Sequence, residues 1–160
     1  MGPPLEQPVA TATRTCTPAA ATTLLSYHGV ETSEEQLAEL CLTSEKGTHL
    51  TGLYRGLSLL APEGHRVRVE SLIVLELMGR PDALPAVVSL KLTQEIADRD
   101  PRFVENWGWD VGVTHTVVVI GFPNEQIVAI ADPGVGRETW TVRGLEELWA
   151  HEVIYLEPDG

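Results

Sequence analysis

The spacing of apolar residues predicts helices in the first third of the chain. Residues 18–27 start with a proline and three alanines and are followed by Gly29, which is typical of a helix and its end. Residues 32–36 offer two overlapping capping boxes, and Leu37, Leu40 and Cys41 follow at helical spacing. Leucines at helical spacing predict a third helix from Thr48, ended by the Pro-Glu-Gly of residues 62–64.

From His65 onward the apolar pattern changes to alternation and short buried runs, which favour strands. The expected strands are residues 66–69, 85–92, 114–122, 126–131, 138–142 and 153–156, with a short helix at 145–149. Residues 71–78 fit a helix or a strand, and residues 93–110 lack periodicity and predict a long loop. Helices followed by strands indicate an α+β fold with a mostly antiparallel sheet.

The chain has 160 residues, the length of one domain. Three prolines near the start predict an extended arm over residues 1–13, which leaves residues 14–160 as the folded domain. With 11 basic and 23 acidic side chains the net charge is −12, which disfavours nucleic acid and anionic membranes as partners. Apolar runs are too short for membrane insertion, and residues 1–6 lack a secretory signal. The missing secretory signal and two cysteines that are best interpreted as thiols favour a cytoplasmic location.

Cys16 comes directly before the first predicted helix. The amide groups and dipole at a helix start favour a thiolate, the nucleophilic form of cysteine. Cys16 is therefore a candidate nucleophile, and a buried structural thiol is the alternative. Cys41 lies among the leucines of the second predicted helix and is expected in the core.

His115 and Asp132 are the candidates for a base and its orienting carboxylate. His115 starts one predicted strand and Asp132 ends the next, and antiparallel strands joined by a turn bring such positions together. A strand-edge histidine and a turn-forming aspartate are the alternatives. Ligand spacing for a metal is lacking, so neither metal nor cofactor is expected. The aromatic step of residues 107–109 either walls a substrate groove or covers the core.

With these residues placed, the sequence resembles the bacteriocin-processing peptidases, also called double-glycine leader peptidases, which have a papain-like fold. The family pattern runs from a Cys-Gly-Pro-Ala-Ala-like helix start to a final Asp-Pro. Its motifs correspond here to Cys16-Thr17-Pro18-Ala19-Ala20, Tyr27-His28-Gly29, Ser33-Glu34-Glu35, Gly47-Thr48, Gly52-Leu53, His115-Thr116-Val117-Val118-Val119 and Asp132-Pro133. The resemblance covers about residues 14 to 156.

This resemblance implies a cysteine peptidase that hydrolyses a peptide bond, after Gly-Gly in a leader peptide, through a thioester. It implies Cys16 as nucleophile, His115 as general base and Asp132 as the residue that orients the imidazole. The implied partners are a peptide or protein substrate and a transporter or larger protein. Relatives that transfer the acyl group to an amine use the same triad and form a further alternative.

Two positions depart from the family pattern. Ala10 stands where the family carries an oxyanion-hole glutamine six residues before the cysteine, and the nearest upstream glutamine is Gln7. Thr17 replaces the glycine after the cysteine, so its side chain is expected to intrude where substrate must approach. Loss of one oxyanion donor typically lowers kcat by about 10²–10³. These departures support the second hypothesis, a peptide-binding module of the same fold with weakened catalysis.

Overall fold

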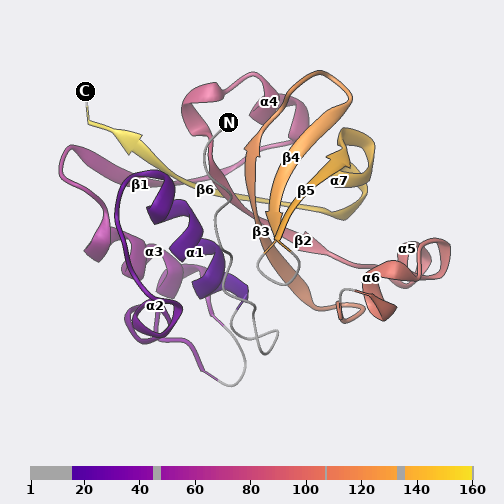
Figure 1. The fold of residues 1–160 in the computed structure, drawn as a ribbon, viewed down its shortest axis with the longest axis horizontal. Helices are drawn as coiled ribbons and strands as arrows, with labels where there is room; N and C mark the ends of the chain where they lie inside the picture. Colours follow the sequence, from indigo (N-terminus) through magenta and orange to yellow (C-terminus); the bar gives the residue numbers. More distant parts are fainter. Residues whose placement is uncertain (1–15, 45–47, 107, 133–135, 160) are drawn as a thin grey trace.

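A six-stranded antiparallel sheet with the order β1-β6-β2-β3-β4-β5 forms the centre of the protein (Figure 1). The computed structural model describes residues 16–44, 48–106, 108–132 and 136–159. The strands are β1 (His65–Ser71), β2 (Ala86–Lys91), β3 (Thr114–Gly121), β4 (Ile127–Asp132), β5 (Gly136–Thr141) and β6 (Trp149–Pro158). The sheet confirms the α+β, mostly antiparallel arrangement expected from the sequence. The arm expected over residues 1–13 lies outside the described residues.

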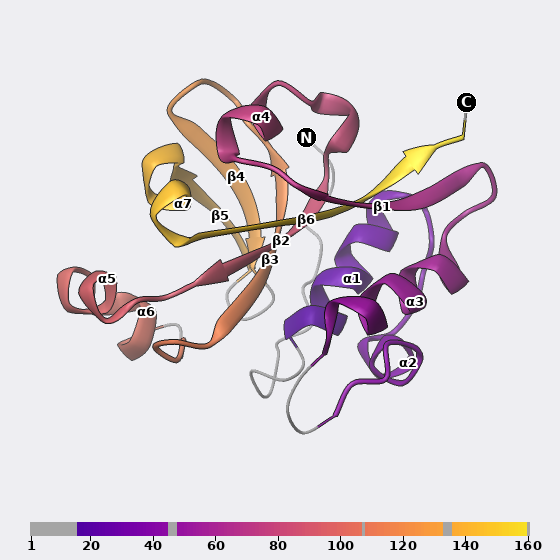
Figure 2. The same cartoon turned by 180° about the vertical axis from the view of Figure 1, so that it is seen from behind.

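Helices come before and between the strands of this sheet, and β6 is the last element in the described part of the chain. In the described ranges they are α1 (Cys16–Tyr27), α2 (Glu34–Leu40), α3 (Leu50–Leu60), α4 (Val74–Met78), the 3₁₀ helix η2 (Pro81–Ala83), α5 (Gln94–Arg99), α6 (Arg102–Glu105) and α7 (Val142–Leu148). Helices α1 to α3 lie together on one side, and two opposite views show this arrangement (Figures 1 and 2). Across the described ranges, none of the helices combines the length and apolar character needed to cross a bilayer.

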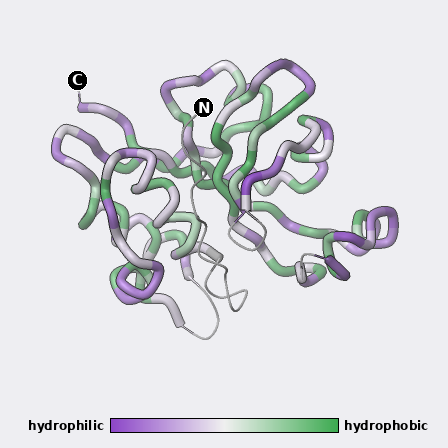
Figure 3. Tube along the Cα trace, viewed as in Figure 1, coloured by the Kyte–Doolittle hydropathy of each residue, from purple (hydrophilic) through white to green (hydrophobic). Residues whose placement is uncertain are grey.

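The sheet buries both of its faces, and the alternation along β3 shows how. Val117 and Val119 belong to a core cluster that includes α4, α5 and α7, whereas Val118 belongs to the cluster of α1, α2 and α3. Successive side chains of a strand point to opposite faces, so one apolar run serves two cores. Hydrophobic residues accordingly follow the central strands, while α5 and α6 are more hydrophilic (Figure 3).

Glycines allow α3 to pack closely against the end of α2. A Cβ atom added at Gly56 would lie 2.3 Å from the sulfur of Cys41, and one at Gly52 would lie 2.0 Å from the Cys41 carbonyl oxygen. Cys41 is 1 % exposed, as expected for a core thiol, although it caps α2 rather than lying within it. Burial raises the pKa of the Cys41 thiol to about 11, which leaves it protonated and unreactive near neutral pH.

The prediction of a loop over residues 93–110 is wrong, because this segment contains α5 and α6. Thr93 caps α5 by accepting a hydrogen bond from the backbone N–H of Ile96, and Pro101 separates the two helices. Helices of six and four residues are too short to show a helical repeat in the sequence. Trp109, at the end of this segment, is 3 % exposed and belongs to the core.

Several other boundaries differ from the prediction. The ambiguous residues 71–78 divide between the end of β1 and helix α4. Helix α7 begins three residues earlier than expected, because the Thr141 side chain accepts a hydrogen bond from Gly144 N–H and caps it there. The last strand, β6, is longer than predicted and reaches Pro158 by pairing with β1.

Candidate active site

His115 and Asp132 lie in contact across the adjacent strands β3 and β4. His115 Nε2 donates a hydrogen bond to Asp132 Oδ1 over 3.1 Å. Asp132 is completely buried and His115 is 8 % exposed. The pairing of Val118 with Ala131 places the start of β3 beside the end of β4, the relationship that the sequence pattern predicted. A buried carboxylate that accepts from Nε2 fixes the orientation of the ring and leaves its other nitrogen, Nδ1, for a second partner.

An aromatic cluster covers the imidazole of His115. The Trp109 ring lies 3.9 Å from it between centroids, with an interplanar angle of 38°. Phe103 and Trp140 pack around Trp109 at centroid distances of 5.1 and 6.1 Å. The cluster restricts the rotamer of His115 and keeps water from one side of its hydrogen bond to Asp132. Of the two interpretations of the aromatic step, the core position holds for Trp109, and Trp107 lies outside the described residues.

Helix α1 brings the candidate nucleophile to the same end of β3. Cys16 is the first residue of α1, and its side chain lies outside the described part of the chain. The next residue, Thr17, forms a 2.9 Å hydroxyl–hydroxyl hydrogen bond with Thr116, the neighbour of His115 in β3. Both cartoon views show the first turn of α1 directed at the start of β3 (Figures 1 and 2). Cys16 and His115 are therefore the chain neighbours of two residues, Thr17 and Thr116, whose side chains are hydrogen-bonded to each other.

The start of α1 provides a favourable electrostatic environment for an anion. Its twelve residues align their peptide dipoles, and the first amide N–H groups of a helix have no partner within it. The first turn carries no acidic residue that would oppose a negative charge. A thiolate or an oxyanion at this helix start is therefore stabilised.

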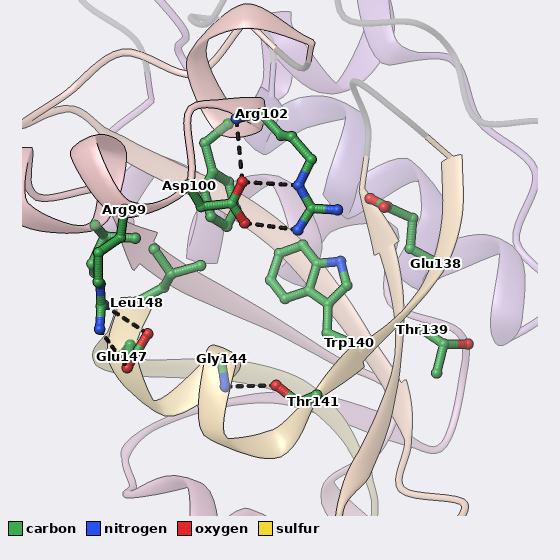
Figure 4. A pocket seen from close by; sticks show the side chains of 12 residues that line it. Arg99, Asp100, Arg102, Glu138, Thr139, Trp140, Thr141, Gly144, Glu147 and Leu148 are labelled. Atoms are coloured by element: carbon green, nitrogen blue, oxygen red, sulfur yellow. Dashed lines mark hydrogen bonds and ion pairs between the residues drawn. The ribbon is translucent and has the colours of Figure 1, made fainter.

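A pocket of about 320 Å³ lies beside the aromatic cluster, between β5, α7 and the α5–α6 segment (Figure 4). Apolar side chains, including Phe103, Trp140 and Leu148, form part of its lining. Two ion pairs flank it, Arg99 with Glu147 at 3.0 Å and Arg102 with Asp100 at 2.7 Å. In the close view the Arg102 side chain lies above the indole of Trp140. Such a pocket, apolar with a charged rim, suits a bulky side chain of a peptide.

Glu138 connects this pocket with the His115–Asp132 pair. It is half-buried on β5 and lines the pocket. Burial raises the pKa of Glu138 above its usual value, and the negative charge of Asp132 raises it further. Both carboxyl groups lie on the paired strands β4 and β5. A change at the pocket wall can therefore affect the candidate catalytic pair.

Metal binding finds no support in the described ranges. They contain no group of three or more histidine, cysteine, aspartate or glutamate side chains that could hold a metal ion. What the site does supply is an oriented imidazole beside a helix start, which is the environment that a cysteine nucleophile with a base requires.

Sequence reasoning missed three residues at the site. Thr116 faces α1 because it directly follows His115 in the strand alternation, a signal that could have been used. Trp140 and Glu138 alternate along β5 with exposed residues, which marks a half-buried strand but not a pocket. Their roles depend on contacts with α6 and β4, which the local pattern does not reveal.

Comparisons with known proteins agree with this fold. Residues 8–79 match the model of the Peptidase C39 family. No curated protein matches the sequence of this chain. The fold is similar to the peptidase domain of Streptococcus ComA, described as a bi-functional ABC transporter of a quorum-sensing pathway, with a TM-score of 0.73 and 22% identity. That match covers 95% of this chain and 97% of the ComA domain.

Two further solved structures share the fold. A double glycine motif protease from an AMS/PCAT transporter, in complex with its leader peptide, matches with a TM-score of 0.71, 14% identity and 99% coverage of both chains. The N-terminal peptidase C39 like domain of a toxin secretion ATP-binding protein from Vibrio parahaemolyticus matches with a TM-score of 0.61 and 13% identity. That match covers 94% of this chain and 100% of the Vibrio domain. The resemblance noted in the sequence is therefore confirmed: this chain matches the Peptidase C39 family over residues 8–79 and has the papain-like fold of C39 peptidase domains.

Proposed function

We propose that this protein is a cysteine peptidase that cleaves a leader-type peptide after a Gly-Gly pair, with Cys16, His115 and Asp132 as its triad. The observation that carries the proposal is the buried His115–Asp132 hydrogen bond at the end of β3 that α1 approaches. An oriented imidazole beside a helix start is what a cysteine nucleophile needs. The match to the Peptidase C39 family supports the reaction class.

In the first half of the reaction, the Cys16 thiolate attacks the carbonyl carbon of the scissile peptide bond. The backbone N–H of Cys16 at the start of α1 donates to the oxyanion of the tetrahedral intermediate. The intermediate collapses, the C–N bond breaks, and the imidazolium of His115 gives its proton to the leaving amine. The product is a thioester between Cys16 and the leader fragment.

In the second half, neutral His115 takes a proton from a water molecule, and the resulting hydroxide adds to the thioester carbonyl. Collapse of this intermediate breaks the C–S bond and releases the leader as a carboxylic acid, with Cys16 returned as the thiolate and His115 as the imidazolium. Asp132 accepts from Nε2 and holds the ring in the same orientation in both halves.

The pocket beside the aromatic cluster supports a peptide substrate. It is lined by Trp140 and Phe103, and Trp140 lies against Trp109, the residue that covers His115. A side chain of the bound peptide that enters this pocket would fix the peptide next to the catalytic pair. The AMS/PCAT relative is described in complex with a leader peptide, and we extend that substrate class to this chain. Association with a transporter or a larger protein is part of the same proposal.

Cleavage of a synthetic leader peptide that contains Gly-Gly tests the proposed function. The wild-type protein should release the leader with a free carboxylate after the second glycine, as measured by mass spectrometry. Cys16→Ala should abolish cleavage, and Asp132→Ala should lower kcat by about 10²-fold with little change in Tm. If Asp132→Ala instead mainly lowers Tm, Asp132 is a turn residue rather than a member of a triad.

A second candidate function is peptide binding with little or no turnover. It is favoured by Ala10, which occupies the position of the oxyanion-hole glutamine in the resembling family. In that case the same peptide should bind, as measured by calorimetry, but remain intact. Ala10→Gln should then raise kcat by up to about 10²-fold, because it restores one oxyanion donor.

A further inference from the structure

We propose that Thr17 and Thr116 form a positioning pair that holds the start of α1 against the start of β3 and so aligns the Cys16 thiolate with His115. The inference rests on the proposed function and adds two residues to it. Each member of the pair is the direct chain neighbour of a candidate catalytic residue, Thr17 of Cys16 and Thr116 of His115. Their hydroxyl groups are 2.9 Å apart although 99 positions separate them in the sequence.

The other threonines of α1 show that the Thr17 contact is unusual for this helix. Thr22 donates to the carbonyl of Pro18 at 2.9 Å, and Thr23 donates to the carbonyl of Ala19 at 3.2 Å. Both bonds are the local contact with the residue four positions earlier that threonine commonly makes in helices. Thr17 is only the second residue of α1, so no residue of the helix lies four positions before it. Its hydroxyl bonds to the sheet instead.

The sheet holds Thr116 in a fixed position for this bond. It is 5 % exposed and pairs with Ser89 of β2 inside the sheet. Because side chains alternate along β3, Thr116 faces α1 while His115 faces the aromatic cluster and Asp132. A displacement of the helix start therefore changes the position of Cys16 relative to His115, and the hydroxyl bond resists it.

This arrangement changes the expectation that Thr17 obstructs the substrate. Its hydroxyl is directed at β3 and takes part in the contact between helix and sheet. Substrate cleavage and thiolate formation depend on the distance between sulfur and imidazole, and catalysis is sensitive to displacements of about 1 Å. The bond thus has a role that a purely structural contact elsewhere in α1 does not have.

The test measures the alkylation rate of Cys16 by iodoacetamide at about pH 6 and about pH 9.5, with the labelled peptide quantified by mass spectrometry. The variants are Thr17→Val and Thr116→Val, which remove one hydroxyl with little change in volume, and their double variant. Thr17→Ser and Thr116→Ser retain the hydroxyl. Thr22→Val is the matched control, because it removes a hydroxyl bond of α1 that does not reach β3.

We expect each valine variant to lower the rate at about pH 6 by roughly two- to tenfold, the size of one neutral hydrogen bond. At about pH 9.5, above the ordinary cysteine pKa of about 8.5, the thiolate forms without His115 and the rate should stay unchanged. The double variant should be no slower than the slower single variant, the serine variants should regain the wild-type rate, and Thr22→Val should keep it.

The inference is overturned if both valine variants keep the wild-type alkylation rate at about pH 6. It is also overturned if their rates fall equally at both pH values, or if Thr22→Val lowers the rate as much as they do. His115→Ala separates this failure from that of the proposed function. If His115→Ala slows the reaction at about pH 6 and the threonine variants do not, only the positioning pair is wrong. If His115→Ala has no effect, the triad and the positioning pair are both wrong.

Discussion

The indole of Trp109 lies against the imidazole of His115, with ring centroids 3.9 Å apart. This contact predicts that the ring of Trp109 preserves the reactivity of the site. Trp109→Leu keeps an apolar side chain but removes the aromatic contact, and should lower the free energy of unfolding by about 1 kcal/mol or more. The rate of Cys16 alkylation at about pH 6 should also fall, because His115 gains rotamers and its bond to Asp132 gains access to water. Trp109→Phe should stay close to wild type in both measurements, and equal rates for the two variants would contradict this role.

The pocket at Trp140 should control substrate affinity. Trp140→Ala removes most of one apolar wall and is expected to raise KM for the leader peptide by about tenfold while kcat changes little. Tyr54→Ala is a suitable control, because Tyr54 is an exposed aromatic residue on α3, across the sheet from the pocket. A loss of kcat with unchanged KM would show that Trp140 acts on His115 through Trp109 rather than on the peptide.

Gly56 should be irreplaceable as long as Cys41 is present. Gly56→Ala places a methyl group 2.3 Å from the Cys41 sulfur and should lower the free energy of unfolding by about 1–3 kcal/mol. In a Cys41→Ala background the sulfur is gone, and the same substitution should cost clearly less. Urea denaturation of the four proteins of this cycle measures the coupling. If the two substitutions have additive effects, the contact between residue 56 and the Cys41 sulfur is not the cause of the lost stability.

Glu138 should make stability dependent on pH. Its pKa is raised in the folded protein, so the folded state binds more protons than the unfolded state as the pH rises above the ordinary glutamate value. Ionisation of Glu138 therefore lowers the free energy of unfolding as the pH rises through the folded-state pKa. Below the ordinary glutamate pKa the side chain is protonated in both states, and this loss of stability is absent. Glu138→Gln removes the effect, so the Tm of the variant relative to wild type should be higher at about pH 7 than at about pH 4. Glu125→Gln, in the exposed turn after β3, is the control.

The sequence was sufficient to predict most of the fold, because its longer elements carry clear periodic signals. Helices α1 to α3 and the strands β2 to β4 follow from leucine spacing, capping residues and alternating valines. Helices α5 and α6 were missed, since six and four residues contain less than two helical turns. The packing of Gly52 and Gly56 on Cys41 was also missed, because a glycine in a helix does not reveal what approaches it.

The site was predictable only in the part that strand order fixes. The contact of His115 with Asp132 follows from the turn between β3 and β4. The bond between Thr17 and Thr116 depends on how α1 lies on the sheet, and the pocket at Trp140 depends on α6 and α7 meeting β5. Such contacts between distant segments are products of tertiary packing, which residue spacing along the chain does not encode.

The most direct test of the account is the pH dependence of Cys16 alkylation in the wild-type protein and in His115→Ala. Cys41 contributes little background, because it is buried and its pKa is raised to about 11, and Cys16→Ala measures what remains. A cysteine activated by an imidazolium should react rapidly at about pH 6 in the wild type and about 100-fold more slowly in His115→Ala. A wild-type rate that rises only near pH ~8.5, as for an ordinary thiol, and that His115→Ala does not change, would contradict the proposed catalytic partnership.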